Sequence, residues 1–179
     1  MKATRCLRLA LLGAAAALGL SCGDSTVGVR SRAPTRAEPL FGLPIDPPAP
    51  SVSLLQCTAL PPDSVTQTIG PEGGVIQVGG HALAIPPGAL SEPVAISAIA
   101  PSDTVNRVHF EPQGLTFAQP ASLTMSYANC DVLGSLLPKQ IAYTTDALAI
   151  LELLPSLDDV WGRTVTAPLG HFSDYAIAW

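Results

Sequence analysis

Three histidines and one pair of neighbouring aspartates are the residues whose types could support metal or acid–base chemistry. A metal site needs ligands that converge, and no two of His81, His109 and His171 are spaced as a local pair. Asp158 and Asp159 could offer oxygens to calcium, but calcium takes about six or more oxygens. The neighbouring residues supply few, so a solvated hairpin tip is favoured. No G-x-S-x-G motif marks a nucleophilic serine. We therefore expect no metal, no cofactor and no enzyme of these classes.

The first residues have the three parts of a secretory signal peptide. Lys2, Arg5 and Arg8 precede an uncharged apolar run from Leu9 to Leu20, and small residues follow it. This order is typical of an export signal. The run has about 12 residues, whereas a helix that crosses hydrocarbon needs about 20. We expect residues 1–21 to be removed during export.

The exit from this signal carries a cysteine in a suggestive context. The segment Gly19-Leu20-Ser21-Cys22 resembles the lipobox of bacterial lipoproteins, in which the thiol is diacylated and the chain is cut just before it. The family usually has Leu where this chain has Gly19, and the alternative is an ordinary signal that leaves Cys22 free. Two or three acyl chains anchor a protein stably. In Gram-negative lipoproteins, an Asp directly after the cysteine resembles a signal for retention in the inner membrane. This chain has Gly23 at that position, which favours the outer membrane.

Two further cysteines belong to the exported part. Cys6 leaves with the signal, whereas Cys57 and Cys130 reach an oxidising compartment, where disulfides persist. We predict that they pair. Two free thiols are the alternative. A zinc site is poorly supported, because neither cysteine lies in a C-x-x-C pair.

The charge of the exported chain argues against nucleic acid as a partner. Beyond residue 21 it has 6 basic and 14 acidic residues, which gives a net charge of −8. Proteins bind nucleic acid by neutralising its phosphates with Lys and Arg. This composition predicts the opposite.

Residues 22–63 have the composition of a tether. They contain eight prolines and few aromatic residues. Proline-rich segments are extended and semi-rigid, and proline cannot donate to a sheet. We expect a spacer, with a short apolar patch at Val52 to Leu55 that docks on the domain near Cys57.

From about Ser64 the chain consists of short β-type runs separated by turn residues. Leu123, Met125 and Tyr127 alternate with polar residues, which is typical of a half-buried strand. Many short strands at this spacing predict an antiparallel β-sandwich over residues 64–179. The expected strands are Val65–Ile69, Val75–Val78, Ala82–Ile85, Val94–Ala100, Arg107–Phe110, Ser122–Tyr127, Gln140–Thr144, Ala149–Leu154, Arg163–Ala167 and Phe172–Trp179.

Three segments of this part stand out: Gly73-Gly74-Val75 leading to Leu83-Ala84-Ile85-Pro86-Pro87-Gly88-Ala89-Leu90, then Phe110-Glu111-Pro112-Gln113-Gly114-Leu115-Thr116-Phe117-Ala118-Gln119-Pro120, then His171-Phe172-Ser173-Asp174-Tyr175. Together they resemble the ZU-five domain, named after zonula-occludens and uncoordinated-five proteins, in its bacterial extracellular form. The resemblance covers roughly 65–179. It implies a β-sandwich that binds partner proteins and has no catalytic set common to the family.

The triplet His171-Phe172-Ser173 has a second implication. It is similar to a segment of ZU-five-containing death-domain proteins that cleave themselves between Phe and Ser. In that chemistry Ser173 Oγ would attack the carbonyl of Phe172, with His171 as the base and a strained peptide bond lowering the barrier. The alternative is that His171 caps a loop and Phe172 belongs to the core.

The leading hypothesis is therefore an exported, lipid-anchored cell-envelope protein whose non-catalytic β-sandwich binds or scaffolds an envelope or extracellular protein. Self-cleavage at Phe172 and a purely passive spacer are the two alternatives.

Overall fold

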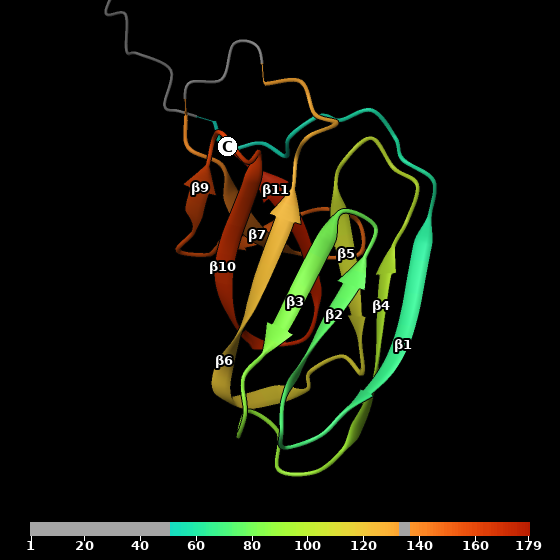
Figure 1. Ribbon diagram of the computed structural model, residues 1–179. Coiled ribbons are helices and arrows are strands. Elements are labelled where there is room, and N and C mark those ends of the chain that lie inside the picture. The colour runs from blue at the N-terminus through green and yellow to red at the C-terminus, as the bar shows by residue number, and fades with distance from the viewer. Residues whose placement is uncertain (1–50, 133–136) are drawn as a thin grey trace, which may run out of the picture. The chain divides into compact units, whose positions relative to one another are not determined.

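The computed structural model describes residues 51–132 and 137–179, and the predicted signal, Cys22 and most of the tether lie outside them. The described part contains no helix long and apolar enough to cross a membrane. Its strands form two antiparallel sheets that pack together, which confirms the predicted β-sandwich (Figure 1). The first sheet has the order β1 (Asp63–Ile69), β4 (Val94–Ala100), β5 (Arg107–Glu111), β11 (Asp174–Ala178), β7 (Gln140–Thr144) and β8 (Ile150–Leu153). The second has the order β2 (Gly74–Val78), β3 (His81–Ile85), β6 (Thr116–Ser126), β10 (Thr164–His171) and β9 (Leu157–Asp159).

Strand β6 shows how alternation builds the core. Leu123 and Met125 are fully buried between the sheets, whereas Thr124 is half-buried on the outer face. There the Thr124 hydroxyl lies 2.8 Å from that of Thr166 on the neighbouring strand β10. Because successive side chains point to opposite faces, one strand supplies the core and a polar surface together.

An aromatic cluster fills one end of the core. The rings of Phe110 and Phe172 stack with centroids 5.0 Å apart, and Phe117 meets Phe172 edge-on at 5.0 Å. Tyr175 lies 6.3 Å from Phe110. Offset stacks and edge-to-face pairs are the arrangements that aromatic quadrupoles favour. Phe172 is therefore a core residue that ties β5, β6 and the bend before β11 together.

Strand β11 is buried on both faces, which its alternating sequence did not predict. Tyr175 and Ile177 face the core, but Ala176 on the outer face is also inaccessible to solvent. Arg107 of β5 lies opposite Ala176 in the register, and its Nη1 reaches the carbonyl of Asp146 beyond β7 at 3.4 Å. The arginine stem therefore crosses the outer face of β11. Long charged side chains commonly cover apolar surface in this way.

The segment before β1 packs against the sandwich. Leu54 pairs with Ala178 in an isolated antiparallel bridge, and Leu55 is 1% exposed. The apolar patch expected near Cys57 thus docks at these two residues. The predicted disulfide joins Cys57 to Cys130, and Thr58 N donates to Asn129 O at 2.9 Å. The described chain enters the sandwich at one end, which holds residues 51–58, Tyr127–Cys130 and the turn 160–163. We call it the proximal end because it is nearest in sequence to the predicted tether (Figure 1).

Glycines with positive φ lie in the turn before β2 and in the turn between β2 and β3. Gly79 has φ +54° in the two-residue connection between Val78 and His81, the conformation in which glycine is favoured. Gly73 has φ +74°, and a side chain there would collide with the backbone of Ile85 and Pro86. Gly73 and Gly79 therefore each permit a turn in which a residue with a side chain would be strained.

The disulfide should contribute measurably to stability. It closes a loop of 73 residues in sequence separation, and loops of this size stabilise by about 4 kcal/mol in the chain-entropy model, less any strain. We expect the double variant Cys57→Ala/Cys130→Ala to lose about 2–5 kcal/mol in urea unfolding followed by circular dichroism. Ser64→Ala, an exposed change on β1, should stay within about 0.5 kcal/mol of the parent. Equal stability of parent and double variant would contradict a structural role.

Candidate functional site

The sequence-predicted site residues lie at opposite ends of the sandwich. His171, Phe172 and Ser173 form the bend between β10 and β11, beside the aromatic cluster. Cys57 and Cys130 lie at the proximal end. The described residues contain no group of three or more His, Cys, Asp or Glu side chains that could hold a metal ion.

The bend at Phe172 is held by the loop that follows β5. Phe172 N donates to Leu115 O at 2.8 Å, and Gly114 N donates to Phe172 O at 3.1 Å. Phe110 N also donates to Ser173 O at 3.1 Å. The peptide group between Phe172 and Ser173 is therefore fixed from the side of the loop, and its carbonyl oxygen is polarised by a backbone N–H.

The side chains of the triplet are arranged differently from a base and its nucleophile. His171 Nδ1 lies 3.3 Å from the carbonyl oxygen of Phe172, and no hydrogen bond in the described part joins it to Ser173 Oγ. The Tyr175 hydroxyl donates to His171 O at 2.6 Å. The non-glycine residues with positive φ, among those described, are Leu148 and Arg163, so this kind of strain is absent from the triplet. These contacts support a structural role for His171. They do not place its ring to take the proton of the Ser173 hydroxyl.

A histidine paired with two carboxylates lies on the outer face of the first sheet, and the sequence did not indicate this pairing. His109 Nδ1 is 2.9 Å from Asp174 Oδ1, and its Nε2 is 2.9 Å from Glu111 Oε1. Asp174 is 5% exposed and also accepts from Gln113 Nε2 at 3.4 Å. Burial lowers the pKa of His109, but hydrogen bonds and charges from Glu111 and Asp174 outweigh it and raise the pKa above 6.5. His109 therefore clamps β5 to β11.

The buried His81 behaves in the opposite way. Its Nδ1 accepts a hydrogen bond from Ser126 N at 3.2 Å, which requires the ring to keep a lone pair there. Burial lowers the pKa of His81 to about 4. His81 therefore stays neutral in the folded protein and joins the β2–β3 turn to β6.

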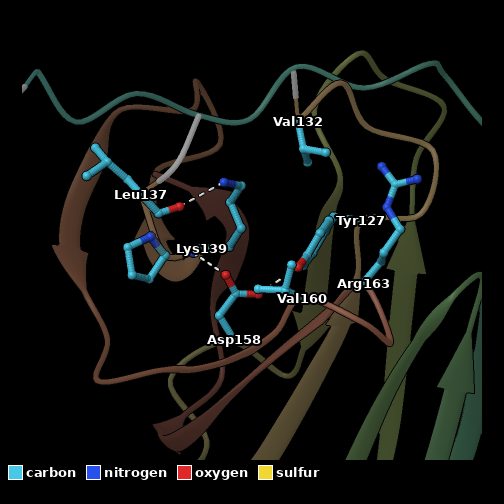
Figure 2. Close-up of a pocket in the computed structure, with 8 residues that line it drawn as sticks. Tyr127, Val132, Leu137, Lys139, Asp158, Val160 and Arg163 are labelled. Atoms are coloured by element: carbon cyan, nitrogen blue, oxygen red, sulfur yellow. Dashed lines mark hydrogen bonds between the residues drawn. The ribbon is translucent and has the colours of Figure 1, made fainter. Parts of the chain in front are cut away.

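A cavity of about 500 Å³ opens at the proximal end (Figure 2). Val132, Leu137 and Val160 contribute apolar walls, and Tyr127 contributes the ring. Cavities of this volume and character are typical of sites that receive a ligand or a partner's side chain. The residues come from five separate places between 127 and 163, so no local sequence pattern could have marked the site.

The polar groups of the cavity are tied to one another. Asp158 accepts from the Tyr127 hydroxyl at 2.7 Å and from Lys139 N at 2.8 Å, as Figure 2 shows. Burial and the Asp158 carboxylate raise the pKa of Tyr127 to about 12, so the phenol remains a donor. Arg163 Nη2 donates to Cys130 O at 2.8 Å. Asp158 thus has partners within the protein, in place of the solvated position predicted for it.

Positive charge concentrates at this cavity. Residues 51–179 contain three Lys or Arg residues and eleven Asp or Glu residues. Two of the three basic residues, Lys139 and Arg163, line the cavity, and the third is Arg107 on the first sheet. With Asp158 also in the lining, the formal charge of the cavity is +1, whereas residues 51–179 together have a formal charge of −8.

A scan of the chain against models of protein families matched no family, and a search of curated proteins found no match.

The two histidines should give the stability opposite pH dependences. The raised pKa of His109 means that its contribution is fully present below pH 6.5 and is lost as the pH rises through the folded-state value. We expect His109→Gln to lose more unfolding free energy at pH 6 than at pH 9, measured by urea unfolding. An equal loss at pH 6 and pH 9 would contradict stabilisation by the pairing of His109 with Glu111 and Asp174.

His81 supplies the matched control, with the sign reversed. In the unfolded chain His81 takes up a proton as the pH falls through about 6.5, whereas in the folded protein, with a pKa of about 4, it stays neutral. The free energy of unfolding should therefore fall by roughly 3 kcal/mol because of this group as the pH is lowered from about 6.5 to about 4. His81→Asn, which keeps an acceptor for Ser126 N, should lack that fall.

Proposed function

We propose that this chain is an exported protein, lipid-anchored at Cys22 in the cell envelope, whose non-catalytic β-sandwich binds another protein. The observation that carries the binding role is the cavity at the proximal end, with apolar walls and two of the domain's three basic residues. The lipobox-like segment and the ZU-five-like motifs support the anchor and the binding role as resemblances. The residue directly after Cys22 is Gly23 and not Asp, which favours the outer membrane.

The side chains at the cavity support protein binding over catalysis. Tyr, Trp and Arg dominate the energetics of protein interfaces, and Tyr127 and Arg163 line the cavity beside the exposed Trp161. The hydroxyl of Tyr127 is engaged by Asp158, so it serves as a fixed wall and not as a proton donor to a substrate. An enzyme would need a nucleophile or an acid–base pair free to meet a ligand there.

Site-specific photo-crosslinking in cells tests the binding role. A p-benzoylphenylalanine residue in place of Val132, which lines the cavity, should give one discrete protein adduct. The same residue in place of Val75, which is 53% exposed on β2 outside this cavity, is the matched control and should give none. No adduct at either position would favour the passive spacer. Equal adduct yields at both positions would show non-specific contact and would contradict a binding site at the cavity.

Self-cleavage between Phe172 and Ser173 is the second candidate function. One contact favours it, because Gly114 N donates to the carbonyl oxygen that would become an oxyanion. Attack by Ser173 Oγ on the carbonyl carbon of Phe172 would form an ester as the peptide C–N bond breaks, and the hydroxyl proton would pass to the former amide nitrogen, which becomes a primary amine. Water would then hydrolyse the ester to the carboxylate of Phe172 and the free hydroxyl of Ser173.

Intact-mass spectrometry under denaturing conditions decides this second function. Cleavage would remove residues 173–179 from the measured mass, and Ser173→Ala would retain them. Because His171 contacts the carbonyl and not the hydroxyl, we expect the parent protein to stay intact on storage. A truncated mass that disappears in Ser173→Ala would establish self-cleavage.

A further inference from the structure

Exposed apolar side chains gather at the proximal end of the sandwich. Nine large apolar side chains are exposed among the described residues, and five of them lie at this end. Trp161 is 96% exposed and Val160 is 67% exposed, both on the turn between β9 and β10. The other three are Val52, Leu60 and Leu137. A fully exposed tryptophan beside other apolar residues marks a contact surface.

Two backbone amides of the turn that carries Trp161 are hydrogen-bonded within the protein. Asp159 Oδ1 accepts from Trp161 N at 3.1 Å and from Gly162 N at 2.9 Å. The carbonyl of Asp159 accepts from the Tyr127 hydroxyl at 3.3 Å. Moving a polar group out of water is costly unless it is hydrogen-bonded. The amides of Trp161 and Gly162 therefore stay paired when the turn enters a poorly hydrated region.

The carboxylates next to the turn are engaged within the protein. Asp158 binds the Tyr127 hydroxyl and Lys139 N, and Asp159 caps the turn. Arg163 follows directly, and its guanidinium lies 6.0 Å from the centre of the Tyr127 ring. A tryptophan tip backed by an aromatic ring and an arginine has the composition of a membrane-interface anchor, where amphipathic rings sit at headgroup level.

We propose that the proximal end docks on the lipid surface, with Trp161 and Val160 seated in the headgroup region. This inference rests on the proposed anchor at Cys22. The chain continues from residue 51 at this end, and 28 residues separate it from Cys22. A tether of such length gives the tip a high effective concentration at the membrane, so weak docking suffices. The acidic domain favours a zwitterionic surface over an anionic one.

The docked orientation also sharpens the proposed function. Val160 belongs both to the tip and to the wall of the cavity. A tip in the headgroup region would place the cavity mouth beside the membrane surface. The protein partner would then be one that presents its contact segment at that surface.

Tryptophan fluorescence in vesicles tests the docking. The full lipidated protein with Trp179→Phe retains Trp161 as its one tryptophan. Reconstituted into vesicles of phosphatidylethanolamine and phosphatidylcholine, it should show blue-shifted emission and quenching by brominated acyl chains. A tryptophan placed by Val75→Trp, with Trp161→Phe and Trp179→Phe, is the control and should show neither. An unshifted, unquenched Trp161 on vesicles that carry the protein overturns docking.

Flotation separates docking from the anchor. Protein that floats with vesicles while Trp161 stays unquenched keeps the anchor and rejects the docking. If the protein isolated from cells carries no lipid, the anchor fails, and docking is then read by titrating this protein, alongside Cys22→Ser, with excess vesicles. A blue shift of Trp161 at high lipid retains the docking, and no shift rejects it.

Discussion

Burial of the last strand on both faces is the constraint on which the rest of the structure depends. β11 lies between β5 and β7, and its inner face carries Tyr175 into the aromatic cluster. On its outer face Ala176 lies opposite Arg107, whose side chain reaches Asp146 O. Ala176 therefore has a packing role that its size alone would not suggest. A strand enclosed in this way cannot shift register without moving its side chains to the wrong face.

The two ends of β11 determine the two regions of functional interest. At its start, the loop after β5 grips the bend through Gly114 and Leu115, and His109 clamps Asp174. At its end, Leu54 pairs with Ala178, which brings the incoming chain to the same place as the disulfide. The first end is dense with backbone hydrogen bonds and well suited to rigidity. The second combines a cavity with exposed apolar side chains and is better suited to contact with other molecules.

Local patterns in the sequence predicted the sandwich and most of its strands, because alternation and glycine turns are short-range signals. Strand β9 was missed because three residues, two of them aspartate, carry no alternation. The predicted strand from Arg163 was expected to end at Ala167, but β10 continues through Pro168 to His171 because β6 pairs along it. The cavity and the His109–Asp174 pair join residues far apart in sequence. Only the strand order brings them together, and no local pattern encodes it.

The aspartates beside Trp161 show how one motif can be interpreted in two ways. As a sequence, Asp158-Asp159 could be calcium ligands or a solvated tip. In the structure one carboxylate closes the cavity by binding Tyr127, and the other caps the turn at Gly162. Both are used to shape the protein, which leaves few oxygens for a cation. Neutral donors, the Tyr127 hydroxyl and backbone amides, bind both carboxylates and fix their positions without neutralising their charge. The exposed Trp161 therefore follows two aspartates whose hydrogen bonds shape the cavity and the turn.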